Sequence, residues 1–384
     1  MSIKHILTWT IALSAILISA CSSPVGGEGS IEFKEIFESR NSRNHIEVEN
    51  TYELDVDDDG YYEWVVLYRF DPTQGSGEWN NTPVQGMVYD AIACDPPLLY
   101  NWYLPIPDND FLSEGSITAT TEDWLDGNSD VSTNELIING PGPVNTLSIY
   151  SFRHNRKDGC QKPNHDTEGF SLLGFFRSNG PITPVKETDQ PLTVTTYQRS
   201  SYERSQLAIR STYVAYSDTV KHQETFLVNG SLKSPDEQTI DFLYGQPESP
   251  QDSPYPEKAV AAFYLSVGQD NARASSFLYG DPDEATFTSA PGWGLDLKPD
   301  EIDHVLIYSI SYTPDVAKER AHQTREVKAV VKPIAKDKNQ VFVPRTVTLQ
   351  VLGVPIDGSE TDCEWRLKEI TNVEVTPGLG MLMN

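Results

Sequence analysis

The sequence predicts a mainly β N-terminal domain followed by a C-terminal α+β domain with an antiparallel sheet. The chain of 384 residues is long enough for two domains, and its many valine, threonine, tyrosine, proline and glycine residues favour strands and turns over helices. Four prolines fall within residues 243–256, a composition typical of a linker. Apolar residues take a helical spacing directly after this segment and then an alternating, strand-like spacing.

The first residues of the chain are expected to be an export signal. Residues 1–20 consist of a short basic start and an apolar run that is too brief for a typical membrane span. Ile18-Ser19-Ala20-Cys21 resembles the bacterial lipobox, in which the cysteine thiol receives a diacylglyceryl group and becomes the mature N-terminus. An ordinary signal peptide that happens to contain Cys21 is the alternative.

The lipobox resemblance implies a lipid-anchored protein of the cell envelope, outside the cytoplasm. The anchor is membrane lipid through acylated Cys21, at the outer membrane of a cell with two membranes and at the outer face of the plasma membrane otherwise. Residues 21–32 are rich in serine and glycine and form a flexible tether. The formal net charge of −27 at pH 7 repels nucleic acid, which excludes it as a partner. The remaining partner stays open between an envelope protein and a glycan.

An exported chain can oxidise its cysteines, and three remain besides Cys21. Cys94 and Cys160 both precede the expected domain boundary, so they are the candidate disulfide pair. Cys363 is then expected to be an unpaired, buried thiol.

The β-rich domain is expected over residues 33–243, and its clearest motif is an acidic loop between the strand-like segments 45–54 and 63–70. The loop reads D-V-D-D-D-G-Y-Y-E, and its acidic positions alternate. Oxygen donors spaced in this way can converge on a hard cation such as Ca²⁺. The candidate ligands are Asp55, Asp57, Asp59, the backbone carbonyl of Tyr61, and Glu63.

This loop is not an EF-hand, because the position that holds the bidentate acid of an EF-hand is Val66. It resembles the calcium hairpins of FG-GAP, or integrin-type, β-propeller repeats, whose last acid falls where Glu63 stands. The resemblance implies a structural calcium ion. An acidic, glycine-containing turn that binds no metal is the alternative.

A faint repeat accompanies the motif. A second Glu-led strand, 135–140, also follows a turn rich in Asp and Gly, and segments 170–177 and 192–197 are a candidate third pair. Propeller blades recur at shorter and steadier intervals, and at least four are needed. The N-terminal domain is therefore expected to be partial-propeller-like or a β-sandwich.

The C-terminal domain is expected over residues 256–376, after a Pro-rich linker at 244–255 and before a tail at 377–384. Pro256 suits the first position of a helix, and Asp270 is expected to cap a second helix that ends before Gly280. The expected strands are 304–312, 325–332, 346–352 and 365–371.

This order of elements resembles the ketosteroid-isomerase-like (SnoaL-like) α+β cone domain. The resemblance implies a cone whose pocket serves catalysis through an aspartate or histidine in some members and is non-catalytic in others. Asp303 and His304 are the only candidate pair here. Adjacent strand residues point to opposite faces, so we do not expect these two to act together.

The sequence does not predict an enzyme, because it contains no G-x-S-x-G, no H-E-x-x-H and no Cys–His motif of known proteases. A non-catalytic binding or scaffolding role is the first prediction. A small-ligand carrier that uses the cone pocket is the alternative, and an envelope hydrolase is the third class. A filled apolar core around Trp365 would favour a scaffold, and an open pocket with buried polar groups would favour a carrier.

Overall fold

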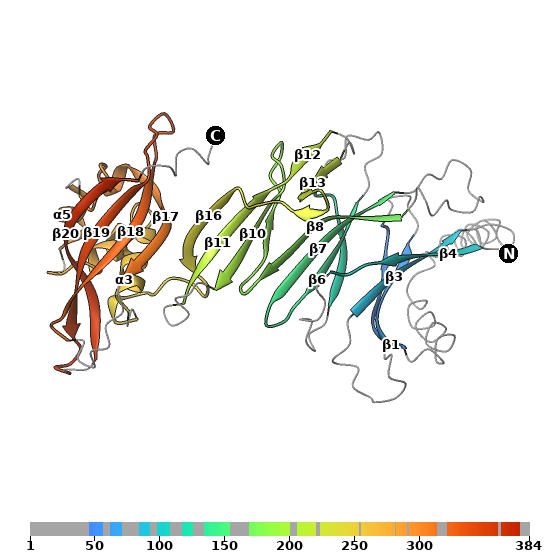
Figure 1. Cartoon of the computed structure of the whole chain (residues 1–384), viewed down its shortest axis with the longest axis horizontal. Helices are drawn as coiled ribbons and strands as arrows, with labels where there is room; N and C mark the ends of the chain where they lie inside the picture. The colour runs from blue at the N-terminus through green and yellow to red at the C-terminus, as the bar shows by residue number, and fades with distance from the viewer. Residues whose placement is uncertain are drawn as a thin grey trace, which may run out of the picture. The chain divides into compact units, whose positions relative to one another are not determined.

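The computed structural model describes the chain between residues 46 and 376, with gaps (Figure 1). The residues that it does not describe are 1–45, 57–61, 71–83, 93–97, 108–116, 126–133, 154–168, 200–205, 220–222, 253–254, 281, 290–291, 313–320, 360–361 and 377–384. The predicted signal peptide, tether and tail lie outside the described residues, as do Cys21, Cys94 and Cys160.

The chain divides into two compact units. The first unit comprises Met1–Arg177, Lys186–Leu192 and Ala215–Leu232, and the second comprises Ser178–Val185, Thr193–Val214 and Lys233–Asn384.

In the described part of the first unit, two four-stranded sheets follow one another along the chain, in blue and green in Figure 1. Each has its strands in sequence order. The first sheet consists of β1 (Ile46–Leu54), β2 (Glu63–Phe70), β3 (Val84–Ile92) and β4 (Leu98–Leu104). The second consists of β5 (Thr118–Glu122), β6 (Glu135–Gly140), β7 (Asn145–Arg153) and β8 (Gly169–Ser178). Two small hairpins complete the unit: β12 (Tyr216–Asp218) with β13 (Gln223–Thr225), and β14 (Leu227–Val228) with β15 (Ser231–Leu232).

The two sheets of the first unit share one apolar core. Alternate residues of β2, Val65 and Leu67, pack into it together with Leu136 and Ile138 of β6. Side chains alternate between the faces of a strand, so Val66 packs on the opposite face of the first sheet. The mainly β character predicted for this region is confirmed.

The second unit begins with a further four-stranded sheet, of order β16-β11-β10-β9. Its strands are β9 (Thr183–Val185), β10 (Thr193–Arg199), β11 (Leu207–Val214) and β16 (Glu237–Phe242). Segments 170–177 and 192–197 therefore do not form the expected pair, because β8 joins the sheet of β7 whereas β10 pairs with β9 and β11.

The C-terminal part of the second unit is an α+β arrangement with the antiparallel sheet β17-β18-β19-β20. Its elements are η5 (Pro250–Asp252), α3 (Pro256–Ser266), α4 (Asn271–Ser276), α5 (Glu284–Ser289), η6 (Pro299–Glu301), β17 (Ile302–Tyr312), β18 (Thr324–Ala335), β19 (Arg345–Pro355) and β20 (Cys363–Val375). Helix α3 starts at the predicted residue, and Oδ1 of Asp270 accepts a hydrogen bond from the backbone N–H of Arg273 at the start of α4. The four predicted strands are confirmed.

The compact units differ from the boundary expected at 244–255. Residues 178–185, 193–214 and 233–243 belong to the second unit, although they fall within the expected N-terminal domain. The reason is apolar packing, because Leu207, Ile240 and Phe242 contribute to the same core as α3 and the C-terminal sheet.

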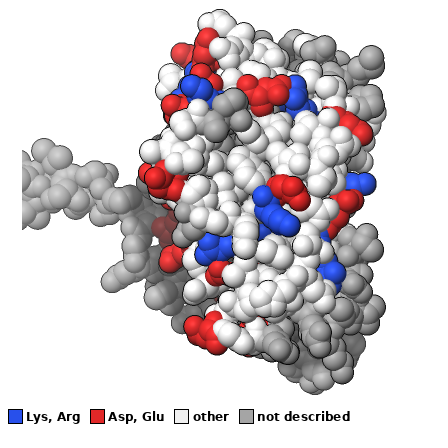
Figure 2. All heavy atoms as spheres, turned by 90° about the vertical axis from the view of Figure 1, so that its left-hand side faces the viewer, with Lys and Arg blue, Asp and Glu red and all other residues white. Residues whose placement is uncertain are grey.

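Charges are mixed on the face that Figure 2 presents, where acidic and basic side chains are interspersed with large uncharged areas. On the C-terminal sheet, oppositely charged side chains form two ion pairs: Lys328 with Glu326 at 3.7 Å, and Arg366 with Glu364 at 2.5 Å. No helix among the described residues has both the length and the hydropathy needed to cross a bilayer.

Candidate functional site

The acidic motif lies in the β1–β2 hairpin of the first unit. Leu54 at the end of β1 is paired with Glu63 at the start of β2. The side chain of Glu63 is buried, and its Oε2 accepts a hydrogen bond from the backbone N–H of Val56 at 2.8 Å. Glu63 therefore ties the start of the loop to the second strand of the hairpin.

Of the five predicted metal ligands, the structure describes Asp55 and Glu63, whereas Asp57, Asp59 and Tyr61 lie outside the described residues. Asp55 is half-buried at the end of the hairpin that also holds Glu63. Within the described part of the chain, no group of three or more His, Cys, Asp or Glu side chains is arranged to hold a metal ion. Both described carboxylates are hard oxygen donors, and this donor chemistry fits Ca²⁺.

The second Glu-led hairpin repeats this geometry. Oε2 of Glu135, at the start of β6, accepts hydrogen bonds from the backbone N–H groups of Trp124 at 2.8 Å and Leu125 at 3.1 Å. Both of these donors follow β5, as Val56 follows β1. We call the two arrangements, Glu63 with Val56 and Glu135 with Trp124 and Leu125, the glutamate clasps. The faint sequence repeat thus corresponds to a repeated local structure.

The two clasps hold buried carboxyl groups. Burial raises the pKa of Glu135 to about 7, although the hydrogen bonds from Trp124 and Leu125 act in the opposite direction, and the nearby charge of Asp123 adds to the rise. A carboxyl group with this pKa gains or loses its proton near neutral pH.

The interior of the C-terminal α+β part is filled by side chains. Tyr264 of α3 is fully buried, and its hydroxyl group donates a hydrogen bond to the backbone carbonyl of Trp293 at 3.0 Å. Phe263 packs edge-on against Tyr264 and Trp293, with ring centroids 5.0 Å and 5.4 Å apart. Trp365 is 2% exposed and belongs to the same core. The core around Tyr264 and Trp365 is therefore filled by side chains.

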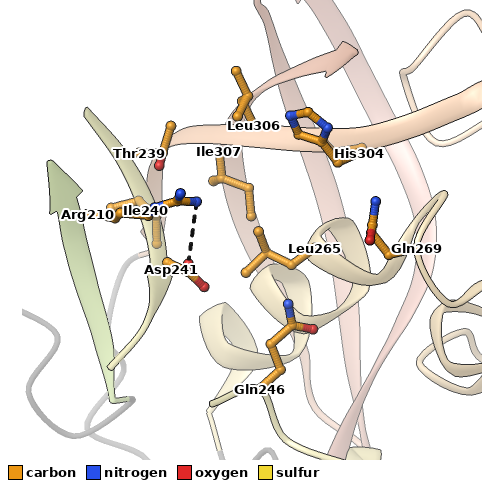
Figure 3. A pocket seen from close by; sticks show the side chains of 11 residues that line it. Arg210, Thr239, Ile240, Asp241, Gln246, Leu265, Gln269, His304, Leu306 and Ile307 are labelled. Atoms are coloured by element: carbon orange, nitrogen blue, oxygen red, sulfur yellow. Dashed lines mark ion pairs between the residues drawn. The ribbon is translucent and has the colours of Figure 1, made fainter. Parts of the chain in front are cut away.

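A cavity of about 370 Å³ lies elsewhere in the second unit, between β16, α3 and β17 (Figure 3). Its polar lining comes from β11, β16, β17 and the segments that flank α3: Arg210, Thr239, Asp241, Gln246, Gln269 and His304. Its apolar lining consists of Ile240, Leu265, Val305, Leu306 and Ile307.

An ion pair lies at the β11–β16 side of the cavity. Nη1 of Arg210 is 4.0 Å from Oδ2 of Asp241, beyond direct hydrogen-bond distance. Oδ1 of Asp241 accepts a hydrogen bond from the backbone N–H of Phe242 at 2.7 Å. Burial raises the pKa of Asp241, while the bond from Phe242 and the charge of Arg210 partly offset the rise.

Asp303 and His304 are in contact, contrary to the expectation that they point to opposite faces. Nδ1 of His304 lies 2.8 Å from Oδ2 of Asp303. The pairing of β17 with β18 shifts register between Ile302 and His304, and this irregularity breaks the alternation of faces at Asp303. Gln269 donates a hydrogen bond to the backbone carbonyl of Asp303 at 2.6 Å, so the bulge also positions a second residue of the cavity.

The sequence alone indicated only His304 among the polar residues of the cavity. Arg210, Asp241 and Gln246 were missed because they come from segments far apart along the chain, and no motif joins them. The irregular register at Asp303 has no sequence signal that we can name.

Cys363 is buried, as expected.

Comparisons with protein-family models, with curated proteins and with solved structures found no match. The function is therefore inferred from the residues of this chain alone. They define a strand-rich protein with a clasped acidic hairpin in one unit and a polar cavity in the other.

Proposed function

We propose that this protein is a lipid-anchored protein of the cell envelope with a non-catalytic binding or scaffolding role. The observation that supports this role is the closely packed core around Tyr264 and Trp365, which suits a scaffold. The lipobox-like Ile18-Ser19-Ala20-Cys21 supports the anchor.

We also propose that the acidic hairpin binds a structural Ca²⁺ ion through Asp55, Asp57, Asp59, the carbonyl of Tyr61, and Glu63. The clasp between Glu63 and Val56 supports this role, because it already holds one end of the loop against β2. The chain's own residues would bind the ion and keep the hairpin closed.

A small-ligand carrier is the second candidate function, and the cavity lined by Arg210, Asp241 and His304 favours it. This cavity lies between β16, α3 and β17, and its apolar lining includes Ile240, Val305 and Ile307 of the core. A carrier of this kind would still be a binding protein anchored at the membrane, so the two candidates share the anchor.

Affinity capture from the envelope tests the binding role. The full-length lipoprotein is produced in a bacterial host with a C-terminal tag, crosslinked in intact cells, and purified in detergent. The matched control is residues 1–32 fused to an unrelated folded domain, which shares the predicted signal and tether. A component that co-purifies with the full-length chain and not with the control is the expected result. Equal recovery of every component from both proteins would contradict a binding or scaffolding role.

A further inference from the structure

The cavity beside β17 presents a particular combination of groups. Figure 3 places the side chains of Arg210 and Asp241 on one side, with Gln246 below and with Gln269 and His304 on the other side. Apolar side chains lie between these polar groups, including Leu265 and Ile307. A surface with an apolar wall and several polar groups that converge on one space is the usual form of a small-molecule site.

The polar groups keep hydrogen-bonding capacity toward this space. Nε of Arg210 is buried and has no hydrogen-bond partner among the described residues. The distance of 4.0 Å between Arg210 and Asp241 leaves both side chains without a direct hydrogen bond to each other. The Arg210 side chain lines the cavity and is 42% exposed, so its Nη groups can donate to a ligand there.

The charges of the cavity favour a neutral ligand. The guanidinium group of Arg210 and the carboxylate of Asp241 offset each other, and the ring of His304 is already paired with Asp303 at 2.8 Å. The formal net charge of −27 at pH 7 repels anions from the protein as a whole. A ligand with separate positive and negative groups would gain little, because it would compete with the existing ion pair.

Hydroxyl groups match the remaining requirements. The amides of Gln246 and Gln269 can both donate and accept, Asp241 accepts when ionised, and Arg210 only donates. A hydroxyl group is itself both donor and acceptor, so adjacent hydroxyl groups can bridge Arg210 and Asp241. The C–H face of a sugar ring suits the apolar wall formed by Leu265 and Ile307. The volume of about 370 Å³ falls at the lower end of small-molecule sites.

We propose that this cavity binds a neutral, polyhydroxylated molecule of the sugar class, either as a free monosaccharide or as a unit of an envelope glycan. Arg210 and Asp241 would bind adjacent hydroxyl groups, and Gln246 and His304 would fix the orientation of the ring. This inference deepens the proposed binding role by naming a ligand class, but it does not depend on the lipid anchor.

Saturation-transfer NMR and isothermal titration on the full-length protein in detergent test the proposal. The probes are glucose, galactose, mannose and N-acetylglucosamine, each as the free sugar and as the β-linked disaccharide. Glycine and glucuronate represent zwitterionic and anionic ligands. At least one neutral sugar is expected to bind more tightly than either charged probe. Tighter binding of the disaccharide indicates a glycan, and equal binding indicates a free sugar.

The variants Arg210→Gln and Asp241→Asn should each weaken sugar binding at least tenfold. Arg199→Gln is the matched control, because Arg199 is exposed on β10 of the same sheet and does not line the cavity. The melting temperature of each variant identifies any that fails to fold. If one cavity variant does not fold, sugar binding by the other tests the proposal. Absence of binding by every neutral sugar, preference for glycine or glucuronate, or equal binding by folded cavity variants and wild type would overturn the proposal. If envelope capture succeeds but no sugar binds, the sugar proposal is overturned and the proposed binding role still stands.

Discussion

The carboxylate of Glu135 accepts a hydrogen bond from the backbone N–H of Trp124 at 2.8 Å, so the first residue of β6 binds the turn that follows β5. Glu63 does the same to Val56 at 2.8 Å in the preceding sheet. Two hairpins of one unit thus close by the same side-chain-to-backbone bond. In each hairpin the two strands are joined by an acidic, glycine-containing sequence, which links the structural repeat to the sequence repeat.

The buried carboxyl group of Glu135 should make stability depend on pH. Its pKa rises from the ordinary 4.5 to about 7 in the folded protein, chiefly through burial. The folded state therefore binds the proton more tightly, and this group lowers the free energy of unfolding as pH rises from 4.5 through about 7. We expect Glu135→Gln to be more stable than wild type at pH 8, by on the order of 1–3 kcal/mol, and similar to it near pH 4.

Urea unfolding followed by tryptophan fluorescence at both pH values measures this effect. Burial also raises the pKa of Glu257 to about 7, so Glu257→Gln should reduce the pH dependence in the same direction. A Glu135→Gln variant that loses stability at pH 8 but not near pH 4 would show that the ionised clasp is the favourable form.

Calcium should stabilise the acidic hairpin. Millimolar Ca²⁺ added after EGTA treatment should raise the melting temperature of the full-length protein, because a ligand at about 100 times its Kd adds about 2.7 kcal/mol to the stability of the state that binds it. Asp57→Asn should remove most of this gain. Asp123→Asn is the matched control, because Asp123 lies in the second turn, which lacks the alternating acids. An unchanged melting temperature of the wild type would contradict the calcium site.

The filled core of the α+β part should respond strongly to truncation. Leu349 is fully buried on β19, so Leu349→Ala should cost about 2–5 kcal/mol through lost burial and a new cavity. Val341, which is 84% exposed, provides the control, and Val341→Ala should change stability by less than about 0.5 kcal/mol. Similar unfolding midpoints for the two variants would indicate that the interior is not packed as described.

Gly268 has a steric role between α3 and β17. Its φ is +84°, and a Cβ there would lie 2.5 Å from the carbonyl oxygen of Ile302. Gly280 has a similar φ of +90° but open space around it. Gly268→Ala should therefore cost more than Gly280→Ala, which carries only the backbone strain of about 1 kcal/mol. Equal melting temperatures for the two variants would rule out the close approach to Ile302.

Local patterns predicted most of the elements but not their long-range partners. The start of α3 at Pro256 and the strand after Glu63 follow from turn chemistry and alternation, which neighbouring residues determine. The six-residue α5 was missed because Phe287 is its only buried residue, which leaves no helical period to detect.

The cavity depends on distant contacts. Arg210 and Asp241 meet only because β11 pairs with β16, and His304 turns toward Asp303 only because the register shifts. Neither relationship leaves a period or a motif in one sequence, so the sequence predicted the acidic hairpin but not the cavity.

The chemical state of the amino terminus distinguishes a lipid-anchored protein from an unprocessed one. Intact-mass and peptide mass spectrometry of the full-length protein, purified from membranes of a bacterial host, identify its first residue and any attached lipid. The mature chain should begin at Cys21 and carry a diacylglyceryl group on the thiol. An unprocessed chain that starts at Met1 and has no acyl mass would contradict it.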